Sequence, residues 1–158
     1  MKNKYNDIYM KIMEIISRLT PDTWSKVWFY GEVLKDATDV YYYFKSKTKN
    51  KLICCMDIPK EYDIDEDDYY DSLEEIDDLI EELYSLFKEN NENKWTNFTL
   101  IFDENRKYDI VFDNTDISNG NFSLRERHVV WRYNVLKMEP SDSYSNNVIK
   151  KYLDNNTR

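Results

Sequence analysis

The chain has 158 residues, a length that suits one domain with a single hydrophobic core. Its apolar fraction of 41% favours a folded protein over a disordered one, and its aromatic fraction of 16%, mostly tyrosine, favours half-buried strands and protein interfaces. The formal net charge of −9 disfavours direct binding to nucleic acid, because phosphates repel an acidic protein while basic partners attract it.

The N-terminal part of the chain predicts one helix followed by three strands. Residues 4–19 predict a helix, because apolar side chains recur on one face: Ile8, Ile12, Ile15 and Leu19. Residues 24–34 alternate between two faces and predict a strand. After a polar turn at 35–39, residues 40–44 and 52–56 predict two more strands, and Pro59 ends the third. Short links between consecutive strands favour an antiparallel arrangement.

Residues 66–89 form the strongest helical pattern of the chain. Its apolar stripe follows spacings of three and four residues: Tyr69, Leu73, Ile76, Ile80, Leu83 and Phe87. Asp65 precedes the pattern and is a suitable N-cap, and an acidic first turn matches the positive end of the helix dipole. We therefore expect a long amphipathic helix that begins next to Asp65 and ends near Asn90.

The rest of the chain predicts a hairpin and two helices. Residues 95–103 and 107–113 alternate as two paired strands, residues 122–137 are helical, and residues 144–154 form a short last helix. The order is α-βββ-α-ββ-α-α, which predicts an α+β fold with an antiparallel five-stranded sheet and flanking helices. We expect a single domain over residues 1–158, with a C-terminal end frayed from about 141.

The cysteine pair and the absence of long apolar runs indicate a cytoplasmic protein. Cys54 and Cys55 are adjacent and would point to opposite faces of a strand, so we expect two reduced thiols that serve packing. No N-terminal signal sequence is visible, and no apolar run approaches ~18 residues, so we expect no membrane contact.

Small counts of glycine and histidine exclude several enzyme classes. With only Gly31 and Gly120, the chain lacks a Walker loop, a dinucleotide-binding fingerprint and a nucleophile elbow. His128 is the single histidine, which excludes zinc sites built on several histidines, and no motif supports a catalytic triad through it. We expect no enzyme, no catalytic residue and no cofactor.

Acidic residues are concentrated in one segment. Residues 57–82 contain fourteen Asp or Glu and one basic residue, Lys60, so the segment carries −13 while the rest of the chain carries +4. On the expected helix, the face opposite the apolar stripe bears six carboxylates, which we call the acidic ladder: Asp67, Asp71, Glu74, Glu75, Asp78 and Glu82. Like charges at these spacings destabilise a helix by roughly 0.2–0.5 kcal/mol per pair. The ladder therefore favours a binding face for a basic partner, although a merely solvated face is the simpler explanation.

A metal site is the other interpretation of the acidic residues. Asp63, Asp65, Asp67, Asp71 and Glu74 match the spacing of an EF-hand calcium loop. However, Asp68 stands where a sharp turn needs glycine, and the helical pattern from 66 would consume most of the loop. Paired carboxylates could also hold Mg²⁺, but no cluster of His, Lys or Arg accompanies them. We expect no bound metal.

The order of several short segments adds a resemblance to a known family. The segments are Pro21–Val27, Val40–Phe44, Ile58–Tyr62, Leu83–Lys88 followed by Trp95-Thr96, Phe112-Asp113, and Arg127–Leu136 with Pro140. In this order and spacing the chain resembles the YezG/EsaG-type immunity proteins of Gram-positive bacteria over nearly its whole length. The resemblance implies an antitoxin that protects a cell from the nuclease domain of a secreted, LXG-type toxin of the type VII system. Such proteins bind the toxin before export, and the resemblance supplies no catalytic residues.

Our leading hypothesis is an immunity protein whose acidic ladder covers the basic substrate-binding surface of a cognate nuclease toxin, in its C-terminal toxin domain. Exposed aromatic residues of the strands are candidate anchors for that partner: Trp28, Tyr30, Tyr41 or Tyr43. The alternatives are a general DNA mimic that binds several DNA-binding proteins, and a metal-dependent enzyme or calcium-binding protein that uses the acidic cluster.

Overall fold

A computed structural model describes the backbone of residues 2–35, 37–92, 94–116 and 121–156. The chain divides into two compact units, Met1–Thr115 and Asp116–Arg158, which we call the N-terminal unit and the C-terminal unit. That one domain spans 1–158, frayed from about 141, stays a prediction. Within the described ranges, no helix combines the length and the apolar character needed to cross a membrane.

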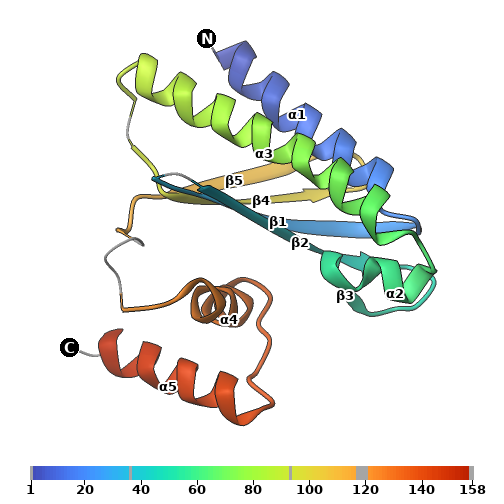
Figure 1. Ribbon diagram of the computed structural model, residues 1–158, viewed down its shortest axis with the longest axis vertical. Helices are drawn as coiled ribbons and strands as arrows, with labels where there is room; N and C mark the ends of the chain where they lie inside the picture. The colour runs from blue at the N-terminus through green and yellow to red at the C-terminus, as the bar shows by residue number, and fades with distance from the viewer. Residues whose placement is uncertain (1, 36, 93, 117–120, 157–158) are drawn as a thin grey trace. The chain divides into compact units, whose positions relative to one another are not determined.

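The N-terminal unit is built on a five-stranded antiparallel sheet, which confirms the predicted α+β class (Figure 1). Its strand order is β3-β2-β1-β4-β5, so β1 lies at the centre. Its elements in chain order are α1 (Lys2–Leu19), β1 (Trp24–Leu34), β2 (Ala37–Ser46), β3 (Leu52–Cys54), the 3₁₀ turn η1 (Cys55–Asp57), α2 (Ile58–Tyr62), α3 (Glu66–Glu89), β4 (Asn97–Asp103) and β5 (Tyr108–Asp113).

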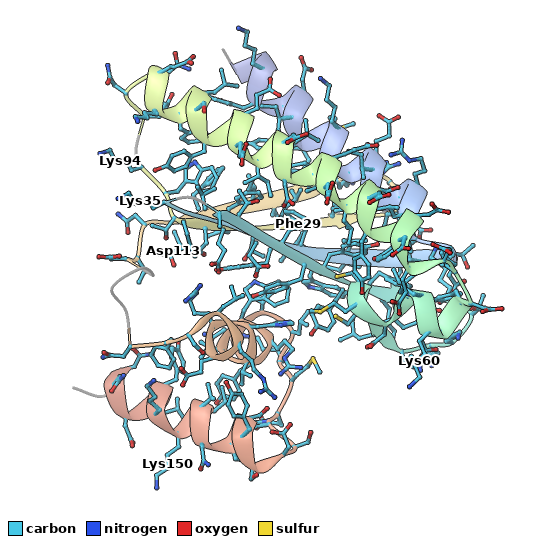
Figure 2. All side chains as sticks on the ribbon, viewed as in Figure 1. Phe29, Lys35, Lys60, Lys94, Asp113 and Lys150 are labelled. Atoms are coloured by element: carbon cyan, nitrogen blue, oxygen red, sulfur yellow. The ribbon has the colours of Figure 1, made fainter. Side chains whose placement is uncertain are left out.

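Helices α1 and α3 lie side by side on one face of this sheet (Figure 1). The core forms between the layers, where Phe29 of β1 is fully buried (Figure 2). Gly31 lets α3 approach the sheet closely, because a Cβ atom there would lie only 2.9 Å from Cδ1 of Ile80 and 3.0 Å from the ring of Phe98. This contact fixes which face of α3 is turned to the sheet and which face is left to solvent.

The second and third strands differ in extent from the prediction. β2 begins at Ala37, not at residue 40, because the β1–β2 pairing continues until Leu34 faces Ala37. β3 ends at Cys54, and Pro59 belongs to the first turn of the short helix α2, where its missing N–H leaves no helical bond unmade. Both cysteines are free, with Cys55 buried and Cys54 half-buried.

The C-terminal unit contains the helices α4 (Leu124–Val135) and α5 (Ser143–Asn156). α4 begins with a capping box, in which Ser123 accepts a hydrogen bond from the N–H of Glu126 and the carboxylate of Glu126 accepts one from the N–H of Ser123. A small apolar cluster joins the two helices: Val129, Val148 and Ile149, with Val130 and Tyr133 against it. Both predicted helices are confirmed, α4 slightly shorter and α5 slightly longer than expected.

Candidate functional site

The acidic ladder lies on the exposed face of α3. All six of its residues are exposed, while the helix buries Tyr69, Ile76, Ile80 and Leu83 on the opposite side. Two residues of the predicted apolar stripe, Leu73 and Phe87, are only half-buried. The predicted separation of a buried stripe from an acidic face is therefore present. Within the N-terminal unit, the ladder is exposed to solvent.

Local sequence explains why this acidic segment is helical at all. The side chain of Asp65 accepts a hydrogen bond from the backbone N–H of Asp68 at 3.2 Å, as expected of an N-cap. Glu66, Asp67 and Asp68 then occupy the first turn, where the helix dipole favours negative charge. These contacts, together with the buried stripe, offset the mutual repulsion of the ladder carboxylates. The helix starts inside the segment that an EF-hand calcium loop would need.

One ion pair joins the ladder to another helix. Arg18 of α1 donates to Oε2 of Glu75 at 3.1 Å, in an ion pair whose side chains are 58% and 57% exposed. An exposed pair of this kind contributes only about 0–1 kcal/mol. The other five ladder carboxylates form no ion pair with any residue in the described ranges, so most of the ladder's charge is left uncompensated.

A shallow groove runs between α1 and α3 beside the ladder. Its volume is about 310 Å³, and α1 lines it with Lys11, Glu14 and Arg18. From α3 it receives Glu75, Asp78 and Glu82, which are three members of the ladder. The groove therefore exposes these three carboxylates from the side of α1 as well as from solvent.

The strand aromatics are not the exposed anchors that the sequence suggested. Tyr30, Tyr41 and Tyr43 are buried, and Trp28 is half-buried. The rings of Tyr30 and Tyr41 stack with centroids 4.7 Å apart, and the hydroxyl of Tyr30 donates to Glu32 at 2.8 Å. The alternation of a strand distinguishes its two faces but does not say which of them is covered, so this prediction was wrong for the three tyrosines.

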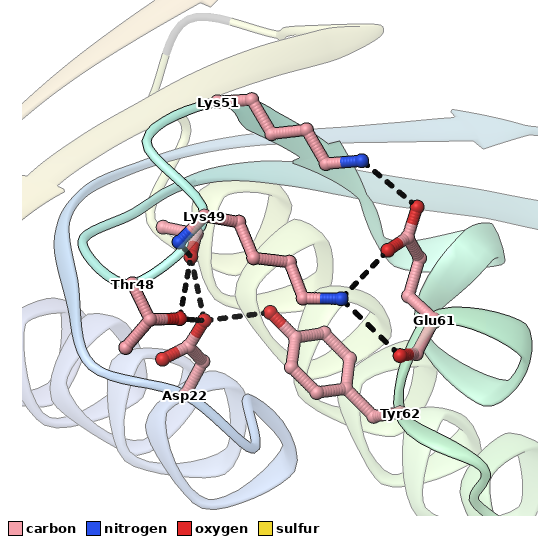
Figure 3. A network of polar contacts seen from close by, with 7 residues as sticks. Asp22, Thr48, Lys49, Lys51, Glu61 and Tyr62 are labelled. Atoms are coloured by element: carbon pink, nitrogen blue, oxygen red, sulfur yellow. Dashed lines mark hydrogen bonds and ion pairs between the residues drawn. The ribbon is translucent and has the colours of Figure 1, made fainter.

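A second polar cluster surrounds Asp22, in the loop between α1 and β1 (Figure 3). Its Oδ2 accepts hydrogen bonds from the hydroxyls of Ser46, Thr48 and Tyr62 at 2.5, 2.7 and 2.7 Å, and its Oδ1 accepts one from the N–H of Thr23 at 2.7 Å. Asp22 and Tyr62 come from two of the segments that carry the family resemblance. The cluster joins the α1–β1 loop, the β2–β3 turn and the end of α2 by hydrogen bonds, so we interpret it as structural.

Acid should weaken this cluster selectively. Burial alone would raise the pKa of Asp22, but the hydrogen bonds from Ser46, Thr48, Tyr62 and Thr23 outweigh it and lower the pKa to about 2 from 3.8. A carboxylate with a lowered pKa in the folded state stabilises the protein above pH 3.8, and this contribution is lost as the pH falls toward 2. We therefore expect D22N to be less stable than the natural chain at pH 6, and the difference to shrink at pH 3. Urea unfolding of both proteins at the two pH values measures it; an equal difference at both would contradict the assignment.

The sequence did not predict a basic pocket that the C-terminal unit contains. Arg125, His128 and Arg132 follow one another at spacings of three and four on α4, and they line a pocket with residues at the start of α5. Burial and the neighbouring charge of Arg132 lower the pKa of His128 to about 4, so the ring is neutral at pH 7. The spacing of these residues on the predicted helix was the available signal, but the part supplied by α5 depends on tertiary contact.

One family model and three known proteins match this chain over most of its length. The family model described as "Immunity protein YezG-like" matches residues 5–150. The "Immunity protein YezG" of Bacillus spizizenii is 31% identical over 153 residues, covering 97% of this chain and 95% of that protein. The protein of the same name from Bacillus subtilis is 32% identical over 147 residues, covering 93% and 97%. The "Type VII secretion system protein EsaG" of Staphylococcus aureus is 28% identical over 150 residues, covering 95% and 92%.

Proposed function

The chain belongs to the YezG-like immunity protein family, and on that premise we propose that it binds and neutralises a cognate nuclease toxin without catalysing a reaction. The name of the Staphylococcus aureus relative supports a toxin of the type VII secretion system. The toxin would be held inactive in the cytoplasm before its export. The partner would be the C-terminal nuclease domain, with neither nucleic acid nor membrane bound directly by this chain.

The observation that carries this proposal is the uncompensated charge of the acidic ladder. Five exposed carboxylates without an ion pair among the described residues stand on one face of a capped helix. A nuclease must hold phosphates, so its substrate-binding surface is basic and attracts this face. Complementary charge speeds the encounter and orients the two proteins. A ladder bound to the substrate-binding surface of the nuclease would exclude the nucleic acid from that surface.

A direct test combines the purified chain with the nuclease domain of a candidate type VII toxin from the same bacterium. The chain alone should cleave no nucleic acid, because it presents no recognised catalytic motif. Added to the nuclease domain, it should abolish DNA or RNA cleavage at a molar ratio near one to one. In cells, expression of the nuclease domain should stop growth, and co-expression of this chain should restore it. Cleavage and growth arrest that continue unchanged in the presence of excess chain would contradict the proposal.

The same assay separates a dedicated antitoxin from a general DNA mimic. A panel of unrelated nucleases should keep full activity in the presence of the chain, since a dedicated interface also rejects wrong partners through shape and unpaired charge. Inhibition of several of these nucleases at similar concentrations would favour the mimic instead.

A further inference from the structure

The C-terminal unit holds a pocket of opposite character to the ladder. Its volume is about 340 Å³, and it lies between the side of α4 that bears Arg125, His128 and Arg132 and the start of α5 at Asp142 and Tyr144. The described residues of this unit carry six Lys or Arg and five Asp or Glu, whereas the whole N-terminal unit carries −11. The pocket is therefore a basic feature in a strongly acidic chain.

The two arginines of this pocket differ from the other arginines that the structure describes. Arg18 pairs with Glu75, Arg106 donates to the carbonyl of Met13, and Arg127 donates to the carbonyl of Phe122. Arg125 and Arg132, by contrast, donate no hydrogen bond to a described residue and form no ion pair with one. Among the described arginines, the two that donate no hydrogen bond to a described residue therefore line the same pocket, where their charges act on Asp142.

The pocket holds Arg125 in place without using its N–H groups. The guanidinium of Arg125 lies over the ring of Tyr144, 4.3 Å from the ring centroid. Such a contact uses the face of the guanidinium and leaves its edge donors directed outward. Arg132 is half-buried on the same side of α4, two helical turns away. Two forked donors thus border one cavity, which is the arrangement that suits a carboxylate or a phosphate.

The charge of the pocket selects between these anions. Asp142 is already engaged, because its two oxygens accept the N–H of Ser145 at 2.7 Å and the hydroxyl of Ser145 at 3.1 Å. With two arginines, one ionised Asp142 and a neutral His128, the pocket has a net charge of +1. One carboxylate balances that charge, whereas the polyanionic backbone of a nucleic acid would also face the repulsion of the whole chain.

We propose that the pocket formed by Arg125, Arg132 and Tyr144 binds one acidic side chain of the toxin, so that the partner is held at two places of opposite charge. This inference rests on the proposed function. A nuclease carries acidic residues beside its basic groove wherever carboxylates hold catalytic metal ions. An inhibitor with both an acidic face and an arginine pocket complements both kinds of charge, and the second contact adds specificity that the ladder alone does not provide.

The test measures the affinity of the toxin's nuclease domain for R125Q/R132Q and for a control, K137Q/K150Q, that removes the same charge from exposed positions of the same unit. R125Q/R132Q should raise Kd by about tenfold or more, mainly through faster dissociation, while the control leaves Kd nearly unchanged. R132K keeps the charge but loses the forked donor, so it should recover only part of the affinity. Alanine substitution of the toxin's Asp and Glu residues should then reveal at least one whose effect disappears in R125Q/R132Q.

The possible outcomes separate the two proposals. Failure of the natural chain to bind the toxin would contradict the proposed function itself. Tight binding by the natural chain with an unchanged Kd for R125Q/R132Q would overturn only the pocket assignment. Binding of a fluorescent DNA or RNA duplex to the natural chain, abolished in R125Q/R132Q, would make the pocket a nucleic-acid phosphate site and overturn the assignment as well. Matched urea unfolding curves for all variants ensure that a loss of affinity reflects the pocket and not the fold.

Discussion

Replacing Ile80 by alanine is expected to lower the free energy of unfolding by about 2–5 kcal/mol, as truncation of a fully buried aliphatic side chain does. Ile80 is fully buried, and its Cδ1 occupies the space above Gly31, where β1 lacks a side chain. Gly31 itself has no side chain that could move into the space left by Ile80. The cavity would therefore persist, and the contact between α3 and the sheet would weaken.

Leu73 provides the matched control for this prediction. It belongs to the same helix and to the same predicted stripe, but it is only half-buried. L73A should therefore cost clearly less than I80A, because less apolar surface is returned to water. Urea unfolding of both variants gives the two values. If I80A is near neutral, or if L73A costs as much, the buried face of α3 is assigned wrongly and the position of the ladder fails with it.

Neutralising four carboxylates of the acidic ladder is expected to leave the free energy of unfolding no lower and to slow association with the toxin. In D71N/E74Q/D78N/E82Q, four like charges are removed from one helix face, so the free protein should be no less stable than the natural chain. Glu75 is left in place because it pairs with Arg18. Association with the nuclease domain should slow by about tenfold or more at low salt, since charge steering accounts for gains of this size. A structural face would lose stability when altered, whereas a binding face loses association rate.

The sequence predicted α3 and its acidic face well because both are local properties. The stripe from Tyr69 to Phe87 repeats over about five turns, and Asp65 has the cap geometry that its position suggested. The short helix α2 was missed because five residues are too few to establish a helical period. The ends of β2 and β3 depend on the pairing of neighbouring strands, which no single segment reveals.

Contacts between distant segments account for the rest of what was missed. Arg18 reaches Glu75 across 57 positions of sequence, so a charge count along α3 alone could not include it. The Asp22 cluster joins residues 24, 26 and 40 positions apart, although two of its members lie in segments that the family resemblance had singled out. The burial of Tyr30, Tyr41 and Tyr43 likewise depends on the folded chain and not on the alternation of their strands.

Association kinetics test most directly whether the acidic ladder is a binding face. The rate of binding to the toxin's nuclease domain is measured at several salt concentrations for the natural chain, for D71N/E74Q/D78N/E82Q and for a control variant, D7N/D57N/E92Q/D109N. The control removes the same charge from exposed positions outside the ladder. We expect the ladder variant to bind slowly with a weak salt dependence, and the control to bind almost as fast as the natural chain, because screening acts over about 10 Å at 0.1 M salt. Equal rates for the ladder variant and the natural chain at every salt concentration would show that the ladder is only a solvated surface.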